Sequence, residues 1–339
     1  DTTSRTGAGN DNISVLAGTN NIFSAEGHDR IIATGGNNGI NTGSGNDRVI
    51  LSGGTNTLVT GINNDTISVS GGNNDLNTGL GNDTVTLNGG INTATTGSGN
   101  DRAFIRGGQQ TLNLGAGQDT VDIIGGTNSV NTGSGNDTVS IKEGFNVVSR
   151  VSDIDLGEGD DNLAVTCSIN LSNYKIAGGP GTDSISVTHN GPISFPGEGN
   201  VSGFENIFVS NSTHQSIDFS GFTSVENITL SSGTTIDGAT VTTTLGANQK
   251  LTLEDITDGD VGAAALSDGG LTIAQSASIT SLDLKLADVG PNSAAVNENL
   301  FIDIAGQGIA TVNLESEDTN FVSLSNSGGL LSILNVIGS

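Results

Sequence analysis

An aspartate returns every 18 residues along the first part of this sequence, and no other feature of the chain is better placed to do chemistry. The members of this column are Asp11, Asp29, Asp47, Asp65, Asp83, Asp101, Asp119 and Asp137. A fixed period this short indicates one structural unit stacked on copies of itself. Because stacked carboxylates repel one another, the pattern predicts that cations lie between them.

Glycine-rich turns precede most of these aspartates, as in residues 43–47 (Gly-Ser-Gly-Asn-Asp) and residues 133–137, which repeat the same five letters. Glycine permits backbone conformations that direct carbonyl oxygens inward without a Cβ clash. A flexible cage of carboxylate and carbonyl oxygens favours calcium, whereas magnesium demands tighter octahedral geometry. The sequence therefore predicts several Ca²⁺ ions along this edge.

A second column lies nine residues after the first and carries side-chain amides instead of acids: Asn20, Asn38, Asn56, Asn74, Asn92, Gln110, Asn128 and Asn146. Small apolar residues follow each aspartate at the second and fourth positions and each amide at the second. This spacing is typical of short strands with one buried face. Each 18-residue unit then forms one coil of a flattened parallel β-solenoid. We expect the stacked amides to hydrogen-bond from coil to coil without metal.

Aspartate and asparagine also cap turns in the absence of metal. Under that alternative, the two residue types should mix freely at both edges. Instead, the first edge is aspartate in eight of eight coils and the second is an amide in eight of eight. This separation favours calcium binding over plain turn capping.

The composition excludes several classes of function. The 339 residues include 36 acids and 10 bases, which give a formal charge of −26 and argue against nucleic acid or a bare anionic membrane as partner. No run of 18 apolar residues could span a membrane. Cys167 is the only cysteine, so no intrachain disulfide can form. The chain begins without methionine or a signal-peptide pattern, and we expect a processed chain or a fragment.

The best repeats read Gly-Ser-Gly-Asn-Asp-Arg-Val at residues 43–49 and Gly-Leu-Gly-Asn-Asp-Thr-Val at residues 79–85. They resemble the glycine-rich nonapeptide of RTX (hemolysin-type) calcium-binding β-rolls, and the likeness covers about residues 7–187. In that family, aspartates of successive turns share each calcium ion with turn carbonyls. The resemblance implies this role for the eight aspartates. The family has acids at both edges, whereas one edge here carries amides.

Two turns depart from the family pattern, because Ala25 and Glu26 replace the usual residues before Asp29, and Asn63 replaces a glycine before Asp65. We expect weaker sites there. Beyond Asp137 the period lengthens, and Asp161 and Asp183 follow at intervals of 24 and 22 residues as further predicted metal ligands. Asp153, Asp155 and Glu158 make another ion plausible near the first of them.

The sequence predicts an all-β protein with an RTX-type β-roll over residues 1–150. It continues into an irregular β-rich region, 151–339, which is a less regular solenoid or a sandwich, with a soft boundary near 150–190. Residues 204–207 (Phe-Glu-Asn-Ile) and 225–228 (Val-Glu-Asn-Ile) resemble phrases that follow RTX repeats in bacterial surface-layer (S-layer) proteins. Acids between Glu254 and Asp260 form another calcium site or a solvated loop, and residues 261–300 could hold a short helix.

We do not expect an enzyme, since the histidines His28, His189 and His214 form no cluster and Cys167 has no evident histidine partner. The leading hypothesis is an extracellular, calcium-stabilised structural protein that self-assembles into a bacterial surface layer, with itself and cell-surface polysaccharide as partners. The alternative is a calcium-stiffened segment of a secreted RTX adhesin. Ice binding is disfavoured, because the outward turn position mixes Glu26, Ile62 and Leu80 with small residues.

Overall fold

The computed structural model describes residues 2–142, 152–166, 171–188, 200–210, 217–231, 235–236, 240–246, 248–254, 257–258, 270–275, 281–287, 300–305, 309, 311–317, 322–325, 327 and 331–338. Their regular structure is almost entirely β-strand, with one short 3-10 helix, η1 (Leu171–Asn173). None of their helices has the length and apolar character that crossing a membrane requires. The chain divides into unit 1, residues 1–164 and 173–182, and unit 2, residues 165–172 and 183–339.

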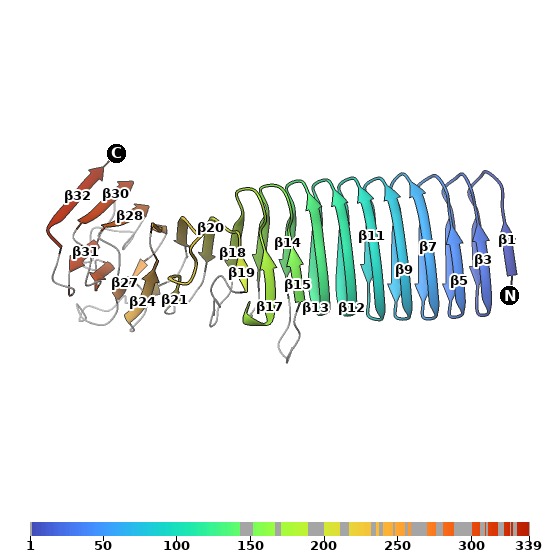
Figure 1. Ribbon diagram of the computed structural model, residues 1–339, viewed down its shortest axis with the longest axis horizontal. Helices are drawn as coiled ribbons and strands as arrows, with labels where there is room; N and C mark the ends of the chain where they lie inside the picture. Colours follow the sequence, from blue (N-terminus) through green and yellow to red (C-terminus); the bar gives the residue numbers. More distant parts are fainter. Residues whose placement is uncertain are drawn as a thin grey trace. The chain divides into compact units, whose positions relative to one another are not determined.

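Unit 1 is a parallel β-solenoid in which each coil contributes to two rows of strands (Figure 1). One row contains β1 (Thr2–Arg5), β3 (Thr19–Phe23), β5 (Asn37–Asn41), β7 (Thr55–Ile62), β9 (Asn73–Leu80), β11 (Ile91–Ser98), β12 (Arg102–Ala116), β13 (Thr120–Ser134), β15 (Ser152–Asp155) and β17 (Tyr174–Ala177). The other contains β2 (Asn12–Val15), β4 (Arg30–Thr34), β6 (Arg48–Ser52), β8 (Thr66–Ser70), β10 (Thr84–Leu87), β14 (Thr138–Ile141) and β16 (Asn162–Val165), together with the first parts of β12 and β13.

The register repeats the sequence period, so each residue lies beside the residue 18 positions further on. Val49 pairs with Ile67, and Ile67 pairs with Val85. The apolar positions expected to face inward are buried in two thin stacks, and Leu51 and Leu58 from facing rows have no exposed surface. The predicted solenoid with 18-residue coils is therefore confirmed.

Close stacking of the coils requires glycine in the turns. A Cβ on Gly45, where φ is +126°, would lie 1.9 Å from the carbonyl oxygen of Gly27 in the preceding coil. At the opposite edge, a Cβ on Gly72 would lie 2.5 Å from the carbonyl oxygen of Gly54. The two irregular turns have non-glycine residues at positive φ, with +76° at Ala25 and +80° at Asn63. An alanine there is strained.

Unit 2 has wider coils. One row contains β18 (Ser184–Thr188), β20 (Asn206–Ser210), β22 (Asn227–Ser231), β25 (Lys250–Glu254), β28 (Ser281–Ala287), β30 (Thr311–Glu317) and β32 (Ile333–Gly338). A second contains β21 (Ile217–Asp218), β24 (Thr240–Leu245), β27 (Gly270–Gln275), β29 (Leu300–Ile304) and β31 (Val322–Ser325), and β23 (Thr235–Ile236) pairs with β26 (Thr257–Asp258). A short strand, β19 (Val201–Ser202), precedes β20.

All strand pairs within unit 2 are parallel, and paired residues in neighbouring coils are 21 positions apart between Asn206 and Asn227 and 33 apart between Lys250 and Asp283. This arrangement is a solenoid, which decides between the two alternatives that the sequence left open. In the stretch expected to hold a short helix, the described residues form β27 and β28. The alanines at 263–265 and 294–295 lie outside the described residues.

Candidate metal centre

The aspartate column of unit 1 lies in the turn before each strand of the second row, with its side chains directed into the solenoid. The backbone N–H of each aspartate donates to Oδ1 of the aspartate in the next coil. These bonds measure 2.7–2.8 Å from Asp11 to Asp161. Asp65, Asp83, Asp119 and Asp137 are each only 1% exposed. Ten predicted ligands are thus placed, eight of them in one continuous line of 18-residue coils.

The second carboxylate oxygen of these residues has no donor. In the described part of the chain, Oδ2 of Asp29, Asp47, Asp65, Asp83, Asp101, Asp119 and Asp137 is buried without a hydrogen-bond partner. Burying an acceptor without a donor is costly, and burying a carboxylate oxygen is more so. The orphaned oxygens recur once in every coil, so they are a property of the repeat.

Burial raises the pKa of six column carboxyls, Asp47, Asp65, Asp83, Asp101, Asp119 and Asp137. The pKa of Asp65 and that of Asp119 are raised to about 7, mainly by desolvation and further by the neighbouring column charges. The hydroxyl of Thr60 lowers the pKa of Asp65 in part, although its proton points to the carbonyl of Thr78 at 3.1 Å. An uncompensated negative column is therefore unfavourable at neutral pH.

The charge of unit 1 lies largely in this column. Eighteen acids and eight bases give residues 1–164 and 173–182 a formal charge of −10. Nine of those acids are column members, from Asp11 to Asp161, so the rest of the unit carries −1. A cation in the column would neutralise the only large charge that unit 1 has.

A buried hydroxyl column, which was not predicted from the sequence, runs beside the carboxylates. It lies five residues before each aspartate and comprises Ser24, Thr42, Thr60, Thr78, Thr96 and Thr132, each of which donates to a carbonyl of the next coil. Leucine replaces the hydroxyl at Leu114 and Leu156. The repeated hydroxyl at one register position was visible in the sequence and could have predicted this column.

At the opposite edge the predicted amide ladder is present. Nδ2 of Asn38 donates to Oδ1 of Asn56 at 2.6 Å and also to the carbonyl of Gly35 at 3.0 Å. The same pattern links Asn20 through Asn92 to Gln110. The ladder stops there, because the Gln110 amide turns to the Gly107 carbonyl and Oδ1 of Asn128 is buried without a partner. Asn146 lies outside the described residues.

An outer row of side chains precedes the aspartates by one residue and is exposed. Oδ1 of Asn82 accepts the backbone N–H of Asn100 at 2.7 Å, and Asn64 and Asn100 act in the same way. His28 occupies this row, as expected for a turn residue, and its Nδ1 accepts the N–H of Asn46 at 2.8 Å. His189, His214 and Cys167 lie outside the described residues.

Unit 2 contains an acidic column of its own, whose later members were not assigned to a site from the sequence. The N–H of Asp183 donates to Oε2 of Glu205 at 2.8 Å, the same type of bond as in unit 1. The backbone of Glu226 follows Glu205, and Gln249 comes next in register. The buried Gln249 amide donates to the carbonyls of Phe219 and Phe222 and accepts from Gly246. The acids thus end at a neutral, fully bonded side chain.

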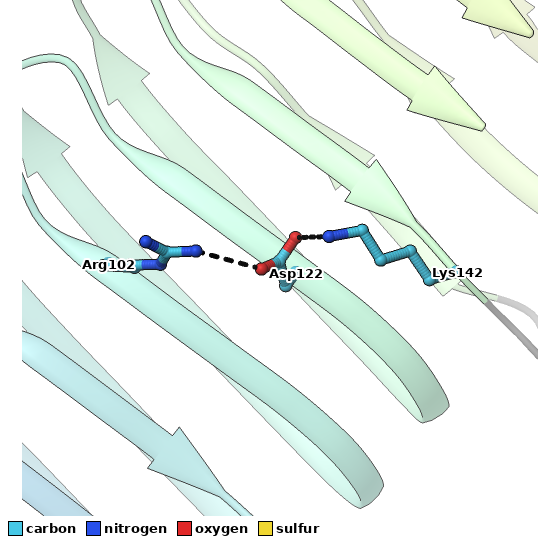
Figure 2. A network of polar contacts seen from close by, with 3 residues as sticks. All are labelled: Arg102, Asp122 and Lys142. Carbon is cyan, nitrogen blue, oxygen red and sulfur yellow. Dashed lines mark hydrogen bonds and ion pairs between the residues drawn. The ribbon is translucent and has the colours of Figure 1, made fainter. Parts of the chain in front are cut away.

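On the outer face of unit 1, three charged side chains from successive coils meet (Figure 2). Asp122 accepts from Lys142 Nζ at 2.6 Å and from Arg102 at 3.4 Å, and the guanidinium of Arg102 lies 4.6 Å from the ring centre of Phe104. These contacts span the coils on both sides of the break in the amide ladder. The network is a surface cross-link and lies apart from the buried column.

The donor set fits a calcium ion bound between coils. Among the described residues, no three His, Cys, Asp or Glu side chains converge on one point, so the column offers carboxylates only from successive coils. Turn carbonyls would have to complete the cage, and glycine lets them approach the axis, as at Gly27. Asp153 and Asp155 are exposed on β15. Asp255 and Asp260 lie outside the described residues.

Comparison with known proteins gave no match: no family model, no curated protein and no solved structure is significantly similar to this chain.

Proposed function

We propose that this protein is a calcium-stabilised structural component of a bacterial surface layer, with a roll of the RTX type. The observation that carries the proposal is the line of buried, donor-free Oδ2 atoms in Asp29 to Asp137. A soluble protein keeps such a line only if something compensates its charge. Divalent cations do so with the ligands that calcium prefers.

The proposed ligands are Asp11, Asp29, Asp47, Asp65, Asp83, Asp101, Asp119, Asp137, Asp161 and Asp183. Bound calcium would supply positive charge between coils. The chain itself holds each carboxylate in place through the Oδ1 bond, such as that from the Asp65 N–H to Asp83 at 2.7 Å. Oδ2 then stays available to the ion. Extracellular calcium sites are typically weak, with dissociation constants of about 10⁻⁴–10⁻³ M, which suits a cell-surface location.

A structural role is favoured over catalysis because the polar side chains of unit 1 are engaged in stacking. The buried amides, hydroxyls and aspartates each bond to the next coil, as Asn56, Thr60 and Asp65 do in a single unit. Side chains used in this way hold one coil against the next. A repeated unit that only stacks is suited to building, and we propose assembly with copies of itself.

The secreted adhesin remains the second candidate, with polysaccharide as its partner. One observation favours it: the outer face of the first row presents exposed Thr57, Asn77, Thr93 and Asn113, for which no hydrogen bond is found among the described residues. Uncharged amides and hydroxyls of this kind can bind sugar hydroxyls. Binding to purified surface polysaccharide, measured by calorimetry on protein that forms no lattice, would favour the adhesin.

The test is a matched pair of variants. Asp83→Asn keeps an Oδ1 acceptor for the Asp65 N–H but removes the charge, whereas Asp75→Asn removes an exposed charge on β9. We expect Asp83→Asn to bind less calcium per chain and to melt at lower temperature in calcium. Asp75→Asn should match the wild type in both. Equal calcium content in all three proteins would contradict the proposed site.

Assembly is measured separately, by electron microscopy of purified protein with calcium and after chelation. Ordered sheets that dissolve in chelator are the expected result. Monodisperse protein under all conditions would refute the surface-layer function while leaving the calcium site intact.

A further inference from the structure

The two units differ sharply in the charge that they present. Apart from its aspartate column, unit 1 carries −1, with eight bases, whereas unit 2 has eighteen acids and two bases, Lys250 and Lys285, and carries −16. Copies of unit 2 repel each other. A contact between unit 1 of one copy and unit 2 of another avoids that repulsion.

Unit 1 contains an arginine pair that lacks an acidic partner. Arg30 and Arg48 are the first residues of β4 and β6, are exposed, and are direct register partners. Their outward neighbours in the same column, Asn12 and Thr66, are neutral. Like charges placed side by side on neighbouring strands are destabilising.

The ion pairs found among the described residues use other bases: Arg102 and Lys142 with Asp122, and Lys250 with Glu315. Arg30 makes one long bond, from Nη1 to Oδ1 of Asn12 at 3.4 Å. No hydrogen bond or ion pair of the Arg48 guanidinium is found in the same residues. Five donors on each guanidinium are thus largely available to an external acceptor.

We propose that Arg30 and Arg48 dock stacked carboxylates on unit 2 of a second copy of this chain, which makes a head-to-tail contact. The inference rests on the proposed surface-layer function and names its contact. Neighbouring strands in any solenoid lie about 4.8 Å apart, so side chains one coil apart on two copies share the same spacing. Glu205 and Glu226, in successive coils of unit 2, show such a pairing of acids.

A second copy fits these arginines better than an anionic polysaccharide does. The carboxylates of unit 2 recur at the strand spacing, so each guanidinium can bind one carboxylate in its fork. A contact between two different surfaces of one chain also propagates from copy to copy without closing into a dimer. Open-ended growth is what a layer requires.

The test compares two full-length variants of equal net charge. R30Q/R48Q removes two positive charges at the pair, and T57E/T93E adds two negative charges at exposed positions on the other face. Assembly is followed in calcium by light scattering and electron microscopy. We expect the first variant to need about tenfold more protein to assemble, and the second to assemble like the wild type. Circular dichroism melts in calcium confirm that both variants fold.

The outcomes separate the two proposals. If the wild type forms no lattice, the surface-layer function fails. If the wild type and R30Q/R48Q assemble equally, the function stands and the docking inference fails. If a charged polysaccharide binds the wild type but not R30Q/R48Q, and assembly is unaffected, the occupant is the glycan and the inference is overturned.

A charge-conserving variant identifies the acidic partner. R30K/R48K places amines at the pair, and a zero-length carbodiimide then links each amine to the carboxylate it contacts. Mass spectrometry of cross-linked assemblies should give intermolecular links from positions 30 and 48 to acids in residues 183–339. Links confined to acids of unit 1 would overturn the proposed head-to-tail contact.

Discussion

The stability of the roll should depend on pH with opposite sign in the absence and in the presence of calcium. Without metal, the relevant groups are the buried carboxyls, of which Asp65 and Asp119 have a pKa raised from 3.8 to about 7. The folded state therefore holds protons that the unfolded state releases between these values. Stability is greatest below pH 4 and is lost as the pH rises toward 7.

The size of the effect follows from the shift. A difference of roughly 3 pH units corresponds to about 4 kcal/mol for each of the two carboxyls, which is a large part of the stability of a typical domain. Calcium reverses the slope, because its ligands must be deprotonated and because a ligand that binds only the folded state stabilises that state. With excess calcium, stability should rise over the same pH range.

The assay is urea unfolding followed by circular dichroism, at steps from pH 4 to pH 8, in calcium-depleted buffer and in excess calcium. Asp65→Asn/Asp119→Asn should flatten the metal-free slope, whereas Asp75→Asn, which removes an exposed charge, should leave it unchanged. A metal-free roll that keeps or gains stability between pH 5 and pH 7 would show that burial of the column carboxyls does not oppose their ionisation, and the reasoning would be wrong.

Three further changes test other parts of the roll by urea unfolding in calcium. Asn74→Ala leaves donors and acceptors of two neighbouring buried amides unpaired and should cost about 2–4 kcal/mol, while Asn77→Ala on the exposed face should cost little; equal losses would contradict the ladder. Gly72→Ala should destabilise by about 1–3 kcal/mol more than Gly71→Ala, because both have positive φ but only Gly72 faces a carbonyl of the preceding coil. Asp122→Asn should cost about 1 kcal/mol, less at high salt, and a salt-independent loss would argue against the ion pairs.

Much of unit 1 could be predicted from sequence because its period is strict. A register of 18 residues fixes which side chains stack, so Val49, Ile67 and Val85 follow from spacing alone. The amide ladder was predictable for the same reason. What spacing could not give was the break at Gln110, where one extra methylene turns the amide toward its own coil. That outcome depends on side-chain reach, which a residue pattern does not contain.

Unit 2 was harder to predict because its coils vary in length. The Glu-Asn-Ile phrases at Glu205 and Glu226 were noticed as a repeat, but their place in line with Asp183 emerged only from the strand register. A longer side chain reaches the same acceptor position from a wider coil. The buried Gln249 gave no periodic signal, since a single amide that satisfies three backbone groups occurs once.

The offset of nine residues between the acid edge and the amide edge constrains how a gene for this roll can change length. Unequal crossing-over that adds or removes 18 codons returns every side chain to its own stack, from Asp47 on one edge to Asn56 on the other. A change of nine codons would place amides among carboxylates and would break both stacks at the joint. Related chains should therefore differ in length by whole coils.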